Sequence, residues 1–144
     1  MAITQLSAFL ENTPGTLCQA VTAISDAGIN IRALSVADTK DFGILRIIVS
    51  DIEKTKEVLG SYTLVSETPV IAVKMDDRSG ALMNILKILE KVSVNIEYVY
   101  AFTAAVTGSA YVVIRVDNVK CAESILAENG ITTLSDKDIE TFLR

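Results

Sequence analysis

The sequence contains no histidine and no tryptophan, and it has only two cysteines and two prolines among its 144 residues. Without histidine, the chain lacks the side chain that most often serves as a general base and as a metal ligand. Cys18 and Cys121 form no Cys-x-x-Cys motif, so we expect small buried thiols in a reducing compartment. The acidic pair Asp76-Asp77 is too small to argue for Mg²⁺. We therefore expect no enzyme, no metal site and no cofactor.

Long apolar runs and an excess of basic residues are also missing. No run approaches the roughly 18 residues that a membrane-spanning helix needs, and residues 1–5 do not resemble a signal peptide. The net charge is −5, which disfavours nucleic acids and anionic membranes as partners. We expect a cytoplasmic protein. Because 50% of its residues are hydrophobic, much apolar surface must be buried in a core or at an interface.

Hydrophobic periodicity predicts a strand, a helix, two strands, a helix and a strand in the first half of the chain. This βαββαβ order is that of the ferredoxin-like unit, a four-stranded antiparallel sheet with both helices on one face. Thr13 is expected to cap the first helix, with Pro14 at its first position. The predicted strands cover residues 3–10, 29–37, 44–49 and 62–65, and the predicted helices begin at 14 and 51 and end before Gly28 and at Gly60.

The pattern then starts again, which predicts an α+β protein of two tandem ferredoxin-like units over residues 1–67 and 68–144. Asp77 would cap the first helix of the second copy. A helix is added after it, with Ser135 and Asp138 in capping-box positions. The strands are apolar on both faces, so a neighbouring unit or a second chain is expected to cover or extend each sheet. Residues 71–75 repeat the alternation of 6–10, 77–82 repeat 12–17, and 94–96 repeat 29–31.

The loop Asn12-Thr13-Pro14-Gly15-Thr16-Leu17 is the main candidate for a binding site. A helix begins inside it, and Gly15 has no side chain to cover the neighbouring amides. Uncovered amides at the positive end of a helix dipole can accept a carboxylate. Asn30, and its repeat Asn95, lie between apolar residues at the start of a strand. The alternatives are that the loop is only a strand-to-helix turn and that the asparagines only cap their own turns.

Leu-Glu-Asn-Thr-Pro-Gly-Thr-Leu at 10–17, followed by Ala-Gly-Ile-Asn-Ile at 27–31, resembles the ACT domain. The second copy shows the weaker Asp-Arg-Ser-Gly-Ala-Leu at 77–82 and Val-Asn-Ile at 94–96. The resemblance implies two regulatory ligand-binding units that pair edge to edge. An amino acid would then lie between the first loop of one unit and the second strand of the facing unit. The implied ligand-binding residues are Leu10, Asn12, Thr13, Pro14, Gly15, Thr16 and Leu17, with Asn95 or Asn30 from the facing unit.

Two departures from the family pattern refine this expectation. Family members that bind serine carry a histidine where this chain has Leu10, so a more apolar amino acid is favoured. In the second loop Asp77 replaces Asn12, and its carboxylate would repel a ligand carboxylate. We therefore expect the first loop to bind and the second to be weaker or structural.

No enzyme or DNA-binding domain accompanies the two units, so we expect a free-standing sensor, homodimeric through its ACT units, or a regulator of a metabolic enzyme in trans. The alternative is an interaction module that regulates an enzyme without binding a small ligand.

Overall fold

The computed structural model describes residues 2–39, 41–103 and 108–142, and these form two compact units. The first unit is Thr4–Thr68, and the second is Pro69–Arg144 together with Met1–Ile3. Each unit has its own set of paired antiparallel strands, its own pair of helices and its own hydrophobic core. The structure thus confirms the predicted α+β class, with βαββαβ-like units and antiparallel sheets.

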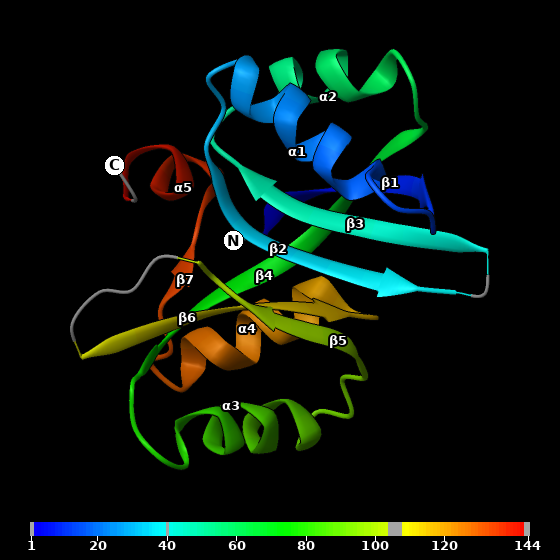
Figure 1. The fold of residues 1–144 in the computed structure, drawn as a ribbon. Coiled ribbons are helices and arrows are strands. Elements are labelled where there is room, and N and C mark those ends of the chain that lie inside the picture. The colour runs from blue at the N-terminus through cyan, green and yellow to red at the C-terminus, as the bar shows by residue number, and fades with distance from the viewer. Residues whose placement is uncertain (1, 40, 104–107, 143–144) are drawn as a thin grey trace. The chain divides into compact units, whose positions relative to one another are not determined.

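In the first unit, strands β1 (Ile3–Glu11), β2 (Ile31–Asp38) and β3 (Phe42–Val49) form an antiparallel sheet in the order β2-β3-β1. Helices α1 (Thr16–Asp26) and α2 (Ile52–Gly60) lie beside each other on one face of these strands (Figure 1). Their inward stripes and the strand positions facing them are apolar, as the periodicity predicted. The core consists of Leu6, Ala8, Leu10, Ala20, Ile24, Ile29, Leu45, Ile47, Val49 and Leu59.

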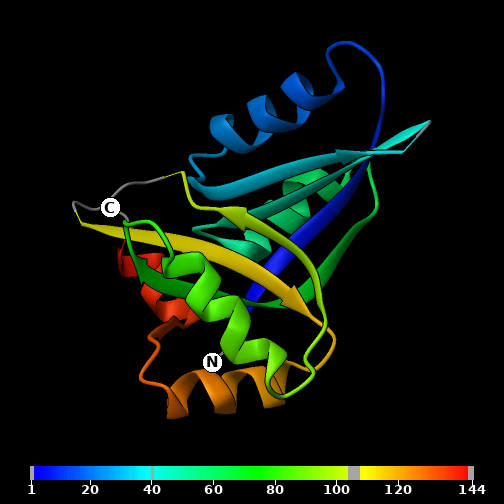
Figure 2. The same ribbon diagram turned by 90° about the horizontal axis from the view of Figure 1, so that it is seen from below.

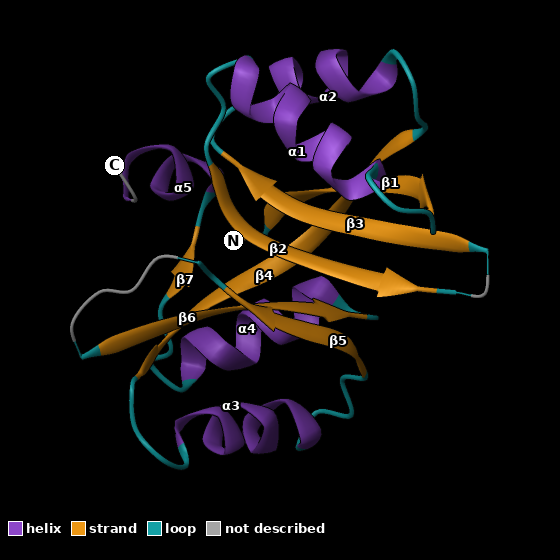
Figure 3. Cartoon of the chain, viewed as in Figure 1, coloured by secondary structure: helices purple, strands orange, loops and turns teal. Residues whose placement is uncertain are grey.

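The second unit repeats this arrangement. Strand β4 (Val65–Asp76) pairs with β6 (Ser109–Val116), which pairs with β5 (Ile96–Ala101). Helices α3 (Ala81–Glu90) and α4 (Val119–Glu128) pack on one face of these strands (Figures 2 and 3). The two-residue strand β7 (Thr133–Leu134) pairs with β4. The core consists of Ile71, Val73, Ile85, Ile88, Leu89, Val94, Val112, Ile114, Val116, Ala122 and Leu126.

Some residues on the sheet faces away from the helices are also buried. Ala33 and Ile48 of the first unit are 0% and 1% exposed, and Ala72 and Val113 of the second are both 0% exposed. Burial on both faces therefore accounts for the apolar residues at these positions, whereas Leu34, Val36 and Val99 on the edge strands are exposed.

Strand β4 differs from the prediction. The sequence pattern indicated one strand over 62–65 and a separate one from 71, whereas a single strand runs from Val65 to Asp76. The joint Thr68-Pro69 lies within this strand. Proline lacks the N–H that a ladder hydrogen bond needs, so its presence suggested an interruption that the backbone does not make.

The start of each unit's first helix also differs. The predicted caps Thr13 and Asp77 are wrong, because the N-cap residues are Gly15 and Gly80, with φ of 86° and 88° and no side-chain cap. Pro14 likewise precedes α1 instead of opening it. In this left-handed conformation a glycine turns the chain from strand to helix without a capping side chain.

The cysteines are less buried than predicted. Cys18 is exposed, Cys121 is intermediate, and both are free thiols. The buried stripe of α1 is centred on Ala20 and Ile24. Since residues two apart do not share a helix face, Cys18 lies away from this stripe.

The C-terminal helix α5 (Asp136–Phe142) begins with the predicted capping box. The backbone N–H of Ser135 and its hydroxyl each donate to Oδ2 of Asp138 at 2.8 Å, and the Asp138 N–H donates back to Ser135 Oγ at 3.2 Å. The predicted end of this helix, Leu143, lies outside the described residues. These hydrogen bonds favour the ionised carboxyl, so the pKa of Asp138 is lowered, first by the backbone N–H and then by the hydroxyl.

This cap makes the stability of α5 depend on pH. Because the carboxyl pKa is lower in the folded state, its stabilisation is complete above the unfolded value of about 4 and is lost as the pH falls through the folded value. We expect Asp138→Asn to remove this acid-dependent loosening. Hydrogen exchange at the buried Ile139 amide, measured between neutral and acidic pH, tests this. Glu140→Gln is the matched control and should leave the pH profile unchanged.

Candidate functional site

The sequence analysis predicted uncovered amides at Gly15, Thr16 and Leu17 in the first strand–helix loop, and in the structure the Thr16 amide is engaged within the turn. The N–H of Thr16 donates to Thr13 O at 3.4 Å, and that of Gln19 donates to Gly15 O at 2.9 Å. Leu17 and Cys18 lie between Thr16 and Gln19 in the first turn of α1. At this place a helix has no earlier carbonyl that could accept a hydrogen bond from their N–H groups. Apart from Gly15 and its two chain neighbours, no described residue comes within 4 Å of the place where a Cβ on Gly15 would stand. The start of α1 is therefore open to an anion.

The side chains of this loop are partly engaged with one another. Thr13 Oγ1 and Thr16 Oγ1 are 2.7 Å apart and share a hydrogen bond, and the Asn12 N–H donates to Asp41 O at 3.4 Å. These contacts fix the conformation of the turn, and the rest of the loop faces solvent.

A hollow of about 230 Å³ lies beside this loop. Of the predicted residues, Leu10 and Thr16 line it, whereas Asn12, Thr13, Pro14, Gly15 and Leu17 do not. Leu10 is 5% exposed, so it belongs both to the hollow and to the core. Partial burial raises the pKa of the Tyr62 hydroxyl above its ordinary value. The lining residues are Phe9, Leu10, Glu11, Thr16, Gln19, Tyr62 and Thr63.

Asn30 and Asn95 lie at the opposite end of their own units from the loops. In the first unit Leu10 pairs with Gly43, whereas Ile31, next to Asn30, pairs with Val49 at the other end of β3. The Asn30 N–H donates to Ser50 Oγ at 3.0 Å. The second unit repeats this pattern, with the Asn95 N–H donating to Asp117 Oδ1 at 3.0 Å. Neither asparagine is thus brought to the loop of its own unit.

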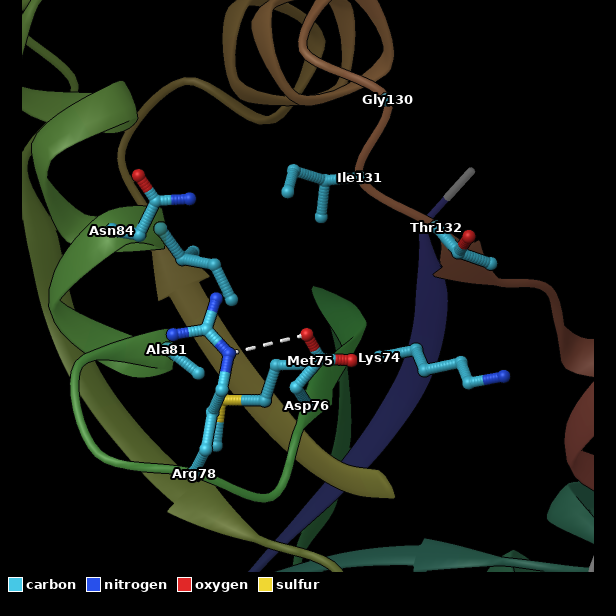
Figure 4. Close-up of a pocket in the computed structure, with 10 residues that line it drawn as sticks. Lys74, Met75, Asp76, Arg78, Ala81, Asn84, Gly130, Ile131 and Thr132 are labelled. Atoms are coloured by element: carbon cyan, nitrogen blue, oxygen red, sulfur yellow. Dashed lines mark hydrogen bonds and ion pairs between the residues drawn. The ribbon is translucent and has the colours of Figure 1, made fainter. Parts of the chain in front are cut away.

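A second hollow, of about 270 Å³, lies at the equivalent place in the second unit (Figure 4). Its charged side chains include Arg78 and Asp76, whose Nε and Oδ2 atoms are 3.4 Å apart. Asp77 does not line it, and the Asp77 N–H donates to Gly108 O at 3.2 Å. The lining residues are Lys74, Met75, Asp76, Arg78, Ala81, Asn84, Ile85, Gly130, Ile131 and Thr132.

The two hollows are copies of one another. In the first, the Phe9 N–H donates to Leu64 O at 3.4 Å, and in the second the Lys74 N–H donates to Thr132 O at 3.0 Å. Each hollow thus lies between the end of a strand, the start of the following helix and the segment after the next helix. Matched pairs are Phe9 and Lys74, Leu10 and Met75, Glu11 and Asp76, Thr16 and Ala81, and Gln19 and Asn84.

Sequence reasoning missed the strand and helix residues Phe9, Glu11 and Gln19 of the first hollow, and it missed the segments after α2 and α4 that complete both hollows. Tyr62 and Thr63 join the first hollow, and Gly130 to Thr132 join the second. Only strand pairing brings these segments beside the loops. The signal available was the repeat itself, which places both segments at matched positions.

Within residues 2–39, 41–103 and 108–142, no group of three or more His, Cys, Asp or Glu side chains is placed to hold a metal ion. None of the helices in the described part of the chain combines the length and apolar character needed to cross a bilayer.

The two βαββαβ-like units, each with a glycine-opened helix, define a class of small α+β modules. A family model described as an ACT domain pair matches residues 1–143, and the chain belongs to this family. Protein BT0572 from Bacteroides thetaiotaomicron is similar at 36% identity, with a TM-score of 0.90 and coverage of 98% of this chain and 97% of that one. None of the curated proteins matches the chain.

The fold also occurs in the regulatory subunits of aspartate kinase from two Thermus species. The Thermus thermophilus subunit has a TM-score of 0.64 and 14% identity, over 87% of this chain and 90% of that one. The Thermus flavus subunit has a TM-score of 0.61 and 16% identity, over 86% and 88%. At these identities the similarity concerns the fold.

Proposed function

We propose that this protein is a non-enzymatic, cytoplasmic regulator that binds an amino acid through the first loop. The observation that carries the proposal is the uncapped start of α1 at Gly15, beside a hollow whose mixed lining includes Phe9, Leu10 and Tyr62. The amides of the first turn would take the ligand carboxylate. Leu10, Phe9 and Tyr62 would contact an apolar side chain, which agrees with the absence of histidine at position 10.

The proposed site includes more of the loop than the residues that line the hollow. Asn12 has an amide side chain that can donate to a carboxylate or accept from an ammonium group. Thr13, Pro14 and Leu17 would shape the turn around the ligand. Asn30 or Asn95 would come from a facing unit, since each lies at the far end of its own.

Exposed apolar residues on the edge strands support pairing of such units in a homodimer. Leu34 and Val36 of β2 lie opposite core residues of β3, on the helix-covered side of the sheet, yet they are 36% and 47% exposed. Val99 of the equivalent strand β5 is 38% exposed. Edge-to-edge pairing would extend the sheet along these strands.

The amino-acid signal would be passed to a metabolic enzyme in trans. A regulatory subunit of aspartate kinase with the same fold supports this arrangement. The second candidate function is an interaction module that regulates an enzyme without a small ligand, and the exposed edge strands favour it equally.

A thermal-shift screen with the common amino acids separates the two functions. A ligand present at 100 times its dissociation constant should stabilise the protein by about 2.7 kcal/mol. We expect the shift from an apolar amino acid and a smaller one or none from serine. Unchanged melting temperatures with every amino acid would contradict the proposal and favour the interaction module.

A further inference from the structure

The hollow in the second unit combines a buried apolar floor with a charged rim. Ala81 and Ile85, on the first turns of α3, are 6% and 1% exposed. Above them stand Arg78, Asp76 and Asn84, which are all exposed. Figure 4 shows the Arg78 guanidinium pointing into the space between Asp76 and Asn84. This is the composition of a small-molecule site, in which a few polar groups orient a ligand over an apolar surface.

The ion pair on this rim leaves Arg78 available to a ligand. It joins Nε to Oδ2 at 3.4 Å, and its two side chains are 65% and 72% exposed. Exposed ion pairs contribute little to stability, so rearrangement of this one is easy. The contact with Asp76 uses Nε of Arg78. The two terminal amino groups of the guanidinium can therefore donate parallel hydrogen bonds to the carboxylate of a ligand.

The charges of the two hollows differ in sign. In the second, Lys74 and Arg78 outnumber Asp76, and the start of α3 adds its positive dipole end. In the first, Glu11 is the one charged lining residue. The position of Lys74 is taken there by Phe9, and that of Arg78 by Thr13 in the repeat. The charged side chains are thus net positive in the second hollow and negative in the first, whereas the positive helix end is common to both.

We infer that the second hollow binds a small organic anion, a carboxylate on a short apolar body without an ammonium group. The carboxylate lies against Arg78 and the Asn84 amide, and the apolar body lies on Ile85 and Ile131. An ammonium group would face Lys74 and the positive end of α3, so a zwitterionic amino acid is disfavoured. The volume of about 270 Å³ suits a ligand of a few carbon atoms. This ligand class differs from the amino acid proposed for the first loop, and neither site depends on the other.

NMR titration of the full chain with 3-methylbutanoate, 4-methyl-2-oxopentanoate and leucine tests the inference. Both acids should shift the amides of Arg78, Ala81, Asn84 and residues 130–132, and leucine should bind there at least tenfold more weakly. Arg78→Gln should weaken binding of the acids at least tenfold. Lys120→Gln, which removes one positive charge at the far end of α4, should leave their binding unchanged.

Asp76→Asn provides a second test, in which the affinity for the acids should rise instead of fall. It keeps the shape of the rim but removes the carboxylate that competes for Arg78, so both acids should bind severalfold more tightly. The inference is overturned if neither acid shifts the amides of the hollow, if leucine binds there as tightly as the acids, or if Arg78→Gln and Lys120→Gln have the same effect. Shifts at residues 13–17 with leucine report on the first loop and leave these outcomes unaffected.

Discussion

Gly15→Asp is expected to abolish the stabilisation given by a bound amino acid, whereas Gly80→Asp should leave it mostly intact. At position 15 the new carboxylate would stand over the amides proposed to hold the ligand, and like charges repel. At 100 times the dissociation constant, about 2.7 kcal/mol of ligand-induced stabilisation would disappear. Thermal shifts of both variants, with and without the amino acid, measure the difference.

The structure makes these two variants a matched pair. Both glycines adopt positive φ, 86° and 88°, so both aspartates bear a similar backbone strain in the unliganded protein. Gly15→Asn adds a neutral side chain of the same shape in the same conformation, which asparagine also tolerates. We expect Gly15→Asn to keep part of the ligand response. Equal loss of the response in Gly15→Asp and Gly80→Asp would show that the two loops are not different in function.

Ile24→Ala and Leu89→Ala should each lower the free energy of unfolding by about 2–5 kcal/mol. The two residues occupy matched positions on α1 and α3, and both are 0% exposed. Truncation leaves a cavity that the strands beneath and the neighbouring helix cannot fill completely. Urea denaturation followed by circular dichroism measures the loss.

Leu64→Ala is the control for these core variants, because Leu64 is 72% exposed and its backbone oxygen keeps its bond to Phe9. Its effect should stay within about 0.5 kcal/mol. A loss below 1 kcal/mol in either core variant would mean that the corresponding helix is not packed against its sheet as the core indicates.

The parts of the fold that periodicity encodes were predictable from the sequence. Ala20 and Ile24 mark the inward stripe of α1, and the alternation of Leu6, Ala8 and Leu10 marks the helix-facing side of β1. Both signals come from residues close together in the chain, where the period of a helix or strand acts directly. The internal repeat then extended the same order of elements to the second unit.

Other features depended on three-dimensional context that no local pattern carries. Thr13 has a capping side chain, but the turn is closed by the left-handed Gly15, and the side chain bonds Thr16 instead. Cys18 lies in an apolar segment but away from the stripe that meets the sheet. Tyr62 and Ile131 complete the lining of the two hollows, and only strand pairing brings them beside the loops. The roles of the predicted ligand-binding residues remain predictions.

The course of β4 has a consequence for the evolution of this chain. The duplicated halves meet at Thr68-Pro69, yet the strand continues through this point from Val65 to Asp76. The second unit also includes Met1–Ile3, from the opposite end of the sequence, and Ile3 is 1% exposed. A gene fragment beginning at Pro69 would therefore encode the repeat without encoding the folded unit. Substitutions can change each hollow separately. Separating the two copies into independent genes would cut β4, so a new end of this strand would first have to form.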